Sequence, residues 1–593
     1  MDKNTILAII LSSVIIIGGM TLMQMTAPEA PDEPPAQTEI VETSPADTSG
    51  SAEKTVVDEA SGSAGSETEV IPELTEQDFP LETFVEETDL FRITFSTAGG
   101  VVKNIELLQE EDEGKPISMV LDGGSGVGTF NLAFGDHDAP YIRSTFSHEK
   151  IHHGKEIIHI FSRDFIKDGQ IFKLTKTYRI IPGEYMIELI VTMETPDGKA
   201  VPLLDGDKQA YTLTYGPQIG PNFEKIDGRY EIRDNVTWGP DPKSGKLKRV
   251  NHRNKTKFVQ IGDTINWAAV VGKYFAVIVD PGSGNSTITW DGNPVEGQTQ
   301  PSRLQISRPA RRQSVIEDTY KFYIGPLDRG NLSRYDRAED NAFGISGMNL
   351  GKAPKTSAVL FWLEAILRWL LEFFYNLIPN YGVAIILLTI LIKLVLFPFT
   401  HKSYESTSKM QAIQPKLKEI QAQYKSDPQK LNAKTAELYK EEGVNPMGGC
   451  LPMLFQFPIF IALYGLLNKF FPLRGAVFIP GWITDLSAPE YIWKFANPID
   501  LKIWTLEAIR LLPVLYLAGQ LLTTKVTQAG QAGSQTGAQQ KMLTLGMPIM
   551  FFFILYNMPS GLLLYWTVMN FVTILQQLIT NYVKKRKAAG GTA

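Results

Sequence analysis

Long apolar stretches in the second half of this 593-residue chain constrain its fold more than any other feature. A helix rises about 1.5 Å per residue, so about 20 apolar residues cross a hydrocarbon core of about 30 Å. With one stretch near the N-terminus, six stretches are long enough, or nearly so. We therefore predict an α-helical polytopic membrane protein with six transmembrane helices. Their expected ranges are 5–25, 380–400, 447–469, 507–523, 543–557 and 561–582.

The N-terminal stretch is expected to act as an uncleaved anchor within residues 1–27. A cleaved secretory signal, cut near Ala27 or Ala30, is the alternative, but the apolar region of a signal usually has only about 7 to 15 residues. Residues 28–78 then hold fourteen Asp or Glu residues against one basic residue, Lys54. Such a segment buries too little apolar surface to offset the entropy of ordering, so we predict a disordered acidic linker.

The hydrophobic pattern changes to a period of two from about residue 79. Phe91, Ile93 and Phe95, for example, alternate with polar residues, and turn signals separate such runs. This pattern is typical of antiparallel strands. We predict a large, mostly β domain over residues 79–345, built as a sandwich. Because Cys450 is the single cysteine of the chain, the core of this domain must be stable without an intramolecular disulfide.

Charged residues recur every four positions in the apolar segment 359–378, at Glu364, Arg368 and Glu372. They therefore line one face of a helix. The opposite face carries Trp362, Ile366, Trp369 and Phe373. We predict an amphipathic helix over residues 356–378 that lies along the membrane interface. A spanning helix whose three charges face other helices is the alternative.

Basic residues gather on one side of the predicted membrane. Eight lysines lie in residues 401–445, and residues 583–593 form a basic tail. Short basic loops stay in the cytoplasm by the positive-inside rule. Six crossings then place both termini in the cytoplasm and the β domain on the opposite side.

Residues 401–445 are also predicted to form a helical hairpin. Apolar residues recur at spacings of three and four, and Ser426, Asp427 and Pro428 supply a cap and a first-turn proline for the return helix. We expect lysines of the hairpin and the basic tail to contact ribosomal RNA or anionic lipid headgroups through charge alone. A solvated hairpin without a partner is the alternative. The basic residues concerned are Lys409, Lys416, Lys418, Lys584, Lys585, Arg586 and Lys587.

Lys393 places a formal charge inside the predicted span 380–400. An uncompensated charge at a helix centre costs about 2.5–3.5 kcal/mol on insertion scales. We therefore predict a water-filled groove beside it, which receives hydrophilic parts of an incoming chain. Snorkelling is the alternative, since Lys393 is seven residues from the cytoplasmic end of the span, roughly 10 Å, and its stem reaches part of that way.

Other predicted spans bring polar side chains to the same interior. Together they favour a wet groove, whereas each one alone is accounted for by a hydrogen bond between packed helices. The candidates for lining the groove with Lys393 are Thr389, Gln456, Gln520, Asn557, Asn570 and Gln576.

Signatures of catalysis or of cofactor binding are weak. We find no Walker loop, HExxH, GxSxG or dinucleotide fingerprint. His148, His152 and His153 suit a metal only if their segment is helical, and surface or β-edge histidines are the expected interpretation. We therefore predict no cofactor, no metal site and no enzymatic activity.

Three segments of the membrane region closely resemble the YidC insertases, relatives of the mitochondrial Oxa and chloroplast Albino proteins. They are NPMGGCLPMLFQFPIFIALY at residues 445–464, MPSGLLLYW at 558–566 with NFVTILQQ at 570–577, and LFPFTHKSYESTSKMQAIQPKL at 396–417. The β segment also resembles the large domain of the Gram-negative members, in TYGPQIGPNF at 214–223 and FYIGPLD at 322–328. The resemblance covers residues 1–25 loosely and 80–582 well.

This resemblance implies a β-supersandwich in the periplasm, an interfacial helix, and five of the six transmembrane helices forming an insertase core in the bacterial inner membrane. The core surrounds a hydrophilic groove. Lys393 lies where the family usually has arginine, so the charge is kept and bidentate hydrogen bonding is lost. The implied partners are nascent membrane proteins, the lipid bilayer, SecYEG with SecDF, and the ribosome with the signal-recognition pathway. No specific nucleic acid is implied beyond ribosomal RNA.

We therefore predict a membrane protein insertase and chaperone that acts alone or with the Sec translocon. Substrate segments are expected to slide along an apolar face of the second and last spans, while Lys393 attracts acidic extracytoplasmic tails. The candidate substrate contacts are Tyr565, Trp566 and Phe571. A channel or transporter is the first alternative, and the lack of inverted repeats speaks against it. An integral-membrane enzyme is the second, and it needs a nucleophile with a nearby base.

Overall fold

The computed structural model describes residues 78–590 apart from 113, 205–207, 224–230, 242, 253–258, 262–264, 292–301, 356–359, 445–450, 501–504 and 529–544. The expected anchor at residues 1–27 and nearly all of the acidic linker at 28–78 lie outside the described residues. The side chains of residues 583–590 in the basic tail also lie outside them.

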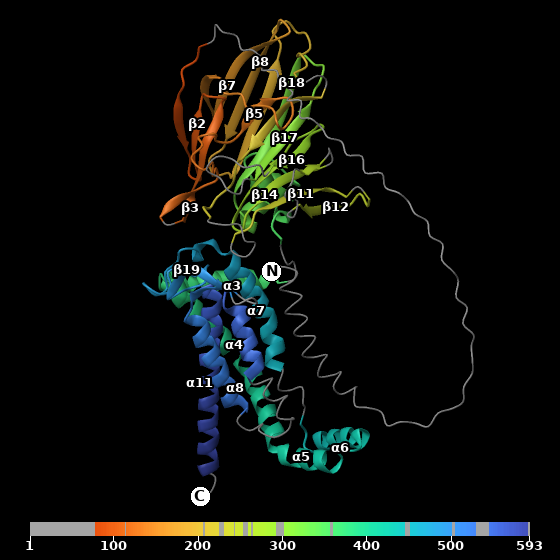
Figure 1. Cartoon of the computed structure of the whole chain (residues 1–593), viewed down its shortest axis with the longest axis vertical. Helices are drawn as coiled ribbons and strands as arrows, with labels where there is room; N and C mark the ends of the chain where they lie inside the picture. The colour runs from red at the N-terminus through yellow and green to blue at the C-terminus, as the bar shows by residue number, and fades with distance from the viewer. Residues whose placement is uncertain are drawn as a thin grey trace, which may run out of the picture. The chain divides into compact units, whose positions relative to one another are not determined.

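Eighteen strands between Thr83 and Pro326 form three antiparallel sheets (Figure 1). The nine-stranded sheet has the order β12-β11-β14-β15-β18-β9-β8-β7-β6, from β6 (Ser147–His153), β7 (Glu156–Lys167), β8 (Gln170–Ile180), β9 (Met186–Glu194), β11 (Asp234–Pro240), β12 (Leu247–Asn251), β14 (Trp267–Val271), β15 (Phe275–Asp280) and β18 (Val315–Pro326). The five-stranded sheet has the order β13-β16-β17-β10-β5, from β5 (Asn131–Phe134), β10 (Gln209–Tyr215), β13 (Val259–Ile261), β16 (Thr287–Asp291) and β17 (Arg303–Pro309). The third sheet consists of β1 (Thr83–Glu87), β2 (Phe91–Ser96), β3 (Val101–Asp112) and β4 (Lys115–Ser118). The prediction of a mostly β domain is confirmed.

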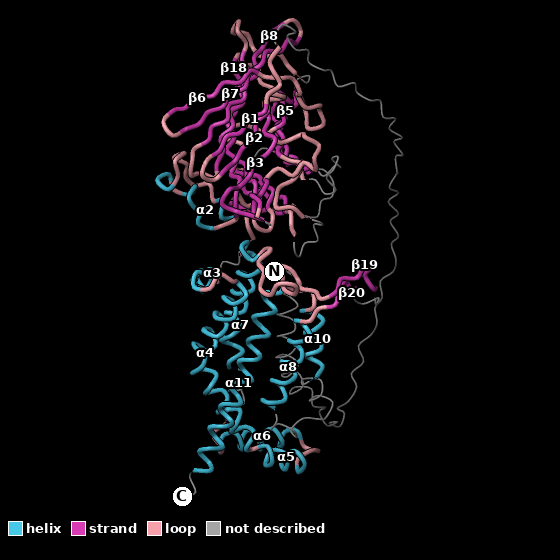
Figure 2. Tube along the Cα trace, turned by 90° about the vertical axis from the view of Figure 1, so that its left-hand side faces the viewer, coloured by secondary structure: helices cyan, strands magenta, loops and turns pink. Residues whose placement is uncertain are grey.

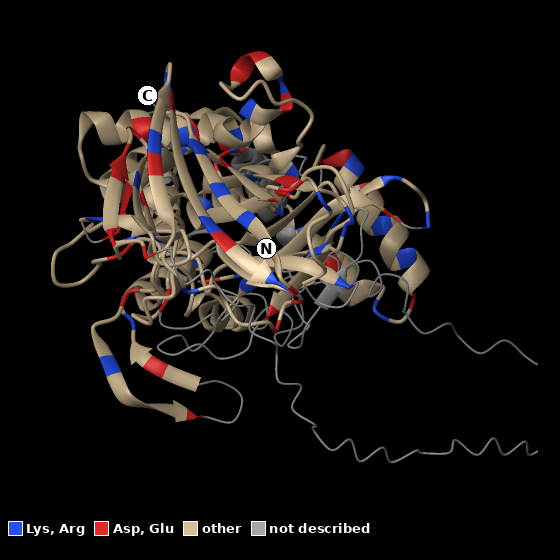
Figure 3. Cartoon of the chain, turned by 90° about the horizontal axis from the view of Figure 1, so that it is seen from above, with Lys and Arg blue, Asp and Glu red and all other residues tan. Residues whose placement is uncertain are grey.

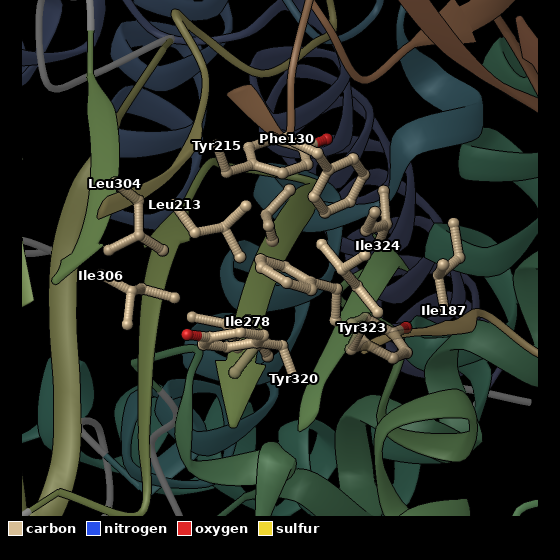
Figure 4. Packing of buried hydrophobic residues seen from close by; sticks show 14 of the residues in the cluster. Phe130, Ile187, Leu213, Tyr215, Ile278, Leu304, Ile306, Tyr320, Tyr323 and Ile324 are labelled. Carbon is tan, nitrogen blue, oxygen red and sulfur yellow. The ribbon is translucent and has the colours of Figure 1, made fainter. Parts of the chain in front are cut away.

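Side chains of the nine-stranded and five-stranded sheets meet in one apolar core (Figure 4). Successive side chains of a strand point to opposite faces, and β7 alternates half-buried and buried positions along its length. The ring of Phe322 in β18 lies 4.8 Å from that of Phe130, just before β5, and 6.0 Å from that of Tyr215 in β10, between centroids. The period of two in the sequence therefore corresponds to strands with one core-facing side.

Helices make up most of the chain after the β domain (Figure 2). They are α2 (Arg329–Ser333), α3 (Phe361–Leu377), α4 (Tyr381–Ala412), α5 (Gln414–Gln423), α6 (Pro428–Glu441), α7 (Leu451–Lys469), α8 (Leu512–Gln528), α10 (Met547–Leu555) and α11 (Ser560–Gly590). Short 3₁₀ helices lie at Arg334–Asp336, Ala338–Asp340, Leu350–Lys352 and Phe471–Leu473. A two-stranded sheet of β19 (Trp493–Asp500) and β20 (Thr505–Ile509) lies between α7 and α8 in the chain.

Two described helices are long and apolar enough to cross a membrane, at Tyr381–Pro398 in α4 and Ser560–Thr580 in α11. The count of six transmembrane helices therefore stays a prediction. The expected span 507–523 is wrong at its start, because Thr505–Ile509 form strand β20 and α8 begins at Leu512. The carboxylate of Glu490 accepts a hydrogen bond from the Leu512 N–H at 2.7 Å. This contact caps the start of α8 from 22 residues away in the sequence, which a local pattern does not reveal.

Helix α3 has the two faces that its sequence predicts. The large apolar side chains exposed on it include Trp362, Ile366, Trp369 and Phe373. On the charged face, Arg368 donates hydrogen bonds to Glu372 at 2.9 Å and to Asp328 at 2.6 Å. Arg368 and Glu372 are therefore bonded within the protein, and the location of α3 along a membrane interface stays a prediction.

Helices α5 and α6 form the predicted hairpin, with a small apolar core of Ile413, Leu417, Leu438 and Val444. Asp427 accepts a hydrogen bond from the Lys430 N–H at 3.1 Å, and Pro428 is the first residue of α6. The predicted cap and first-turn proline are therefore confirmed.

The histidines of the SHEKIHH segment lie on β6, the edge strand of the nine-stranded sheet, with His152 and His153 exposed. His148 Nε2 instead lies 3.1 Å from Nδ1 of buried His159, whose Nε2 lies 3.0 Å from the carboxylate of Glu86. Lys150 pairs with the same carboxylate at 2.5 Å. Among the residues that the structure describes, no three His, Cys, Asp or Glu side chains are arranged so that they could hold a metal ion.

We expect the stability of the β domain to fall as the pH falls from about 6.5 to about 4. Burial lowers the pKa of His159 to about 4, whereas an unfolded histidine has a pKa of about 6.5. In this window the unfolded chain binds a proton that the folded domain excludes, so up to about 3 kcal/mol of stability is lost. Thermal unfolding of the full chain across this pH range measures the loss. His159→Gln keeps a donor for Glu86 and does not titrate, so an undiminished pH dependence in this variant contradicts the assignment.

Candidate functional site

Residues 471–511, here called the cap segment, hold the ends of four helices together. Before α4, the Asn380 amide donates to the Phe478 carbonyl at 3.3 Å. At the start of α11, the Ser560 hydroxyl donates to the Asp485 carbonyl at 2.6 Å. Arg510, two residues before α8, donates to the carbonyl of Tyr556 at the end of α10 at 2.7 Å. These helix ends therefore lie at one level, from which depth along each helix can be compared.

The cap segment also contacts the β domain. The Arg474 guanidinium pairs with Asp112 of β3 at 3.0 Å and with Glu231. Beside it, the ring centroid of Phe471 lies 4.9 Å from that of Phe275 in β15. The same segment thus bonds to the helix ends and to the sheets.

Helix α4 has a buried face and an exposed apolar face. Residues at helical spacing are buried, namely Ile385, Leu388, Thr389, Ile392, Lys393 and Leu396. The large apolar side chains exposed on the same helix are Ile390, Leu394, Val395 and Phe397. Lys393 therefore points toward the other helices and away from the exposed face.

Lys393 is the charged residue on this buried face, with only 8% of its surface exposed. It is twelve residues after Tyr381, about 18 Å along the helix. No hydrogen bond or ion pair joins its ammonium to another residue whose side chain the structure describes. One turn earlier, the Thr389 hydroxyl donates to the Ile385 carbonyl at 2.6 Å, so its donor is already used within the helix.

Four of the other predicted lining residues lie at similar depths in neighbouring helices. Counted from the helix ends at the cap segment, Gln520 in α8 and Asn570 in α11 are about 12 and 15 Å deep. Gln456 in α7 and Gln576 in α11 are about 20 and 24 Å deep. Asn570 packs against Gly519 of α8. A Cβ atom added at Gly519 would lie 3.4 Å from the Cβ atom of Asn570. These depths bracket that of Lys393.

Asn557 differs from the other predicted lining residues. It lies in the turn between α10 and α11, and its amide oxygen accepts a hydrogen bond from the Arg510 guanidinium. This contact holds Asn557 at the helix ends, about 18 Å from the depth of Lys393. The sequence pattern missed this because the partner, Arg510, is 47 residues away in the chain.

The three predicted substrate contacts have different surroundings on α11. Tyr565 is fully buried, and Trp566 stacks on Phe460 of α7 with ring centroids 4.9 Å apart. Phe571 is 51% exposed. It begins an apolar stripe at helical spacing, together with Leu575, Leu578, Ile579 and Tyr582, all of which are exposed. Phe571 is thus the most exposed of the three, whereas Trp566 is half-buried and Tyr565 is buried.

The predicted basic contacts are described only in the helical hairpin and just before it. Lys409 and Lys418 are exposed. Lys416 pairs with Glu442 at 2.5 Å and keeps 62% of its side chain exposed. The side chains of Lys584, Lys585, Arg586 and Lys587 lie outside the described residues.

The chain is similar to known proteins along its whole length. A family model described as 60Kd inner membrane protein matches residues 373–587. A protein of Treponema denticola named membrane protein insertase YidC is 38% identical over 601 residues, which cover 99% of this chain and 100% of that protein. A protein of the same name from Treponema pallidum is 33% identical, and the match covers 98% of each chain.

Two solved structures of similar proteins also match most of the chain. An active YidC insertase with its first transmembrane domain resolved is 18% identical, with 86% of this chain and 95% of that chain covered and a TM-score of 0.32. YidC from Thermotoga maritima is 14% identical, with 85% and 100% covered and a TM-score of 0.26. The whole-chain identities to the two treponemal proteins carry more weight than these low TM-scores.

Proposed function

Because the chain belongs to the YidC family of membrane protein insertases, we propose that it inserts and folds transmembrane proteins in the bacterial inner membrane, through a hydrophilic groove beside Lys393. Its termini lie in the cytoplasm and its β domain in the periplasm. It acts alone or with SecYEG and SecDF, and it receives chains from the ribosome and the signal-recognition pathway. Neither a cofactor nor a catalytic residue takes part.

The observation that carries this proposal is the burial of Lys393 on the inward face of α4. On insertion scales a lysine at the centre of a spanning helix costs about 2.5–3.5 kcal/mol when nothing compensates it. No described acidic residue pairs with this ammonium. Water in a groove is the compensation that we propose, because the side chain points away from the exposed face of the helix.

The groove shortens the path of hydrophilic segments across the hydrocarbon core. Gln456, Gln520 and Asn570 lie at depths close to that of Lys393 and supply amide groups to hydrate such segments. The ammonium attracts acidic periplasmic tails of substrates by charge. Asn557 is left out of the groove because Arg510 holds it at the helix ends.

The apolar part of a substrate slides along the exposed faces of α4 and α11. Leu394 and Val395 are exposed on α4, and Phe571 and Leu575 are exposed on α11. Apolar side chains on both sides match the chemistry of a transmembrane segment that leaves the groove for lipid.

Photo-crosslinking in a strain depleted of its native insertase tests this function. A photoreactive phenylalanine at Phe571 is expected to crosslink a stalled nascent membrane protein several-fold more than the same group at Ile366. Ile366 is a matched control, because it is an exposed apolar residue on α3, with 48% of its surface exposed. Equal crosslinking at both positions, or failure of the unlabelled chain to restore insertion, contradicts the proposed function.

A further inference from the structure

Strands β19 and β20 form a hairpin that belongs to none of the three large sheets. Trp493 is paired with Ile509 across the strands, and Ile499 is paired with Leu506. A two-stranded hairpin alone is at best marginally stable in water. An additional contact surface is therefore expected for it.

The hairpin exposes an unusual amount of apolar surface. Trp493 is 64% exposed and its cross-strand partner Ile509 is 48% exposed. Neighbouring Tyr491 and Ile492 are also exposed, at 51% and 57%. The Ile492 N–H donates to the Ile509 carbonyl at 2.9 Å, so Ile492, directly before β19, adds a further exposed apolar group beside the Trp493–Ile509 pair. A contiguous apolar surface of this kind marks a contact with lipid or protein.

The base of the hairpin is fixed to the ends of two apolar helices. Glu490, three residues before β19, caps α8, and Arg510, directly after β20, donates to the carbonyl of Tyr556, which directly follows α10. Both helices carry exposed apolar side chains, such as Val514 in α8 and Phe553 and Ile554 in α10. The apolar surface of the hairpin therefore continues an exposed apolar surface of the helices.

The direction of the hairpin matches a location at the edge of this helical surface. In the side view it extends sideways at the level of the helix ends (Figure 2), and in the view from above it projects away from the rest of the chain (Figure 3). Its charged residues are few, namely Lys494, Asp500 and Glu507 among those described. Trp and Tyr beside a lysine are the residues that favour the boundary between headgroups and acyl chains.

We propose that the β19–β20 hairpin lies in the boundary layer of the leaflet next to the β domain. Trp493, Ile509 and Ile492 contact acyl chains and headgroups of phospholipids, and Lys494 contacts phosphate. The hairpin thereby fixes the depth of the α8 and α10 ends in the bilayer. This inference rests on one part of the proposed function, namely the orientation of the chain in the membrane.

Spin labels on the full chain in vesicles of phosphatidylethanolamine and phosphatidylglycerol test the location. In a Cys450→Ser background, labels at Trp493→Cys and, separately, at Ile509→Cys are expected to relax several-fold more with oxygen than with a water-soluble nickel chelate. Leu247→Cys on β12 is the matched control, because Leu247 is a strand residue of the β domain with 51% exposure. This control is expected to relax mainly with the nickel chelate.

Relaxation of both hairpin labels like that of Leu247→Cys overturns the proposal. Protection of the labels that appears only when the translocon is added also overturns it, since the surface then contacts protein. An insertion assay on the same variants separates the two proposals. Normal insertion with water-exposed labels refutes only the hairpin location, and lost insertion in every variant, with lipid-exposed labels, refutes only the function.

Discussion

Replacement of Lys393 by glutamate is expected to reduce the insertion of proteins with acidic periplasmic tails by at least about tenfold in cells depleted of the native insertase. At an effective dielectric constant of about 20, unit charges about 7 Å apart interact by about 2 kcal/mol, and glutamate turns this attraction into repulsion. About 1.4 kcal/mol corresponds to a factor of ten in rate. A change of about 2 kcal/mol therefore exceeds what a tenfold reduction in insertion requires. Pulse-labelling followed by protease digestion of the exposed tail measures insertion.

Two further variants distinguish the charge at Lys393 from a general effect. Lys393→Arg keeps the charge at the same depth and is expected to insert substrates normally. Lys525→Glu makes the same charge reversal at an exposed lysine in the last turn of α8, and it is also expected to be tolerated. If Lys393→Glu inserts acidic-tailed substrates as well as the unchanged protein does, the groove assignment is wrong.

In the β domain, Lys176→Met is expected to lower the free energy of unfolding by about 2–4 kcal/mol. The Lys176 ammonium is fully buried and donates to the carbonyls of Gly99, Gly100 and Phe130 at 3.1, 2.7 and 2.7 Å. Methionine fills the space but donates no hydrogen bond. The Gly100 carbonyl still accepts a hydrogen bond from the Tyr178 hydroxyl at 2.8 Å. The carbonyls of Gly99 and Phe130 are therefore the two that lose the Lys176 ammonium without this replacement. A buried polar group left unsatisfied costs about 1–3 kcal/mol.

Hydrogen exchange of the β8 and β9 amides in the full chain measures this loss. Lys173→Met is the matched control, because Lys173 is exposed on the same strand, three residues earlier. Its effect is expected to stay within about 0.5 kcal/mol. Equal exchange in the two variants contradicts the structural role of Lys176.

Elements with a regular local pattern were predictable from the sequence. The alternation at Phe91, Ile93 and Phe95 predicted strand β2, in which all three side chains are buried. The four-residue spacing of charges predicted the two faces of α3. The Asp427–Pro428 cap was predictable because its hydrogen bond joins residues three positions apart. In each case the sequence segment itself contains the interaction that decides the structure.

Features that depend on distant partners were not predictable in this way. Lys176 occupies the buried register of β8 between Leu174 and Tyr178, but its three carbonyl partners come from elsewhere in the chain. Likewise, strand β20 replaces the expected start of a helix, since Glu490 and Arg510 fix where α8 begins. For the candidate site, the inward direction of Lys393 follows from helical periodicity, whereas the position of Asn557 follows from one long-range hydrogen bond.

The bonds between the cap segment and the helices have a mechanical consequence. A helix that is bonded at one end and tilts there moves most at its opposite end. Helix α11 has 31 residues and is about 46 Å long, so a tilt of about 5° displaces its free end by about 4 Å. Any parting of α4 from α11 therefore widens with distance from the cap segment, and a passage formed in this way is tapered, narrowest beneath the β domain.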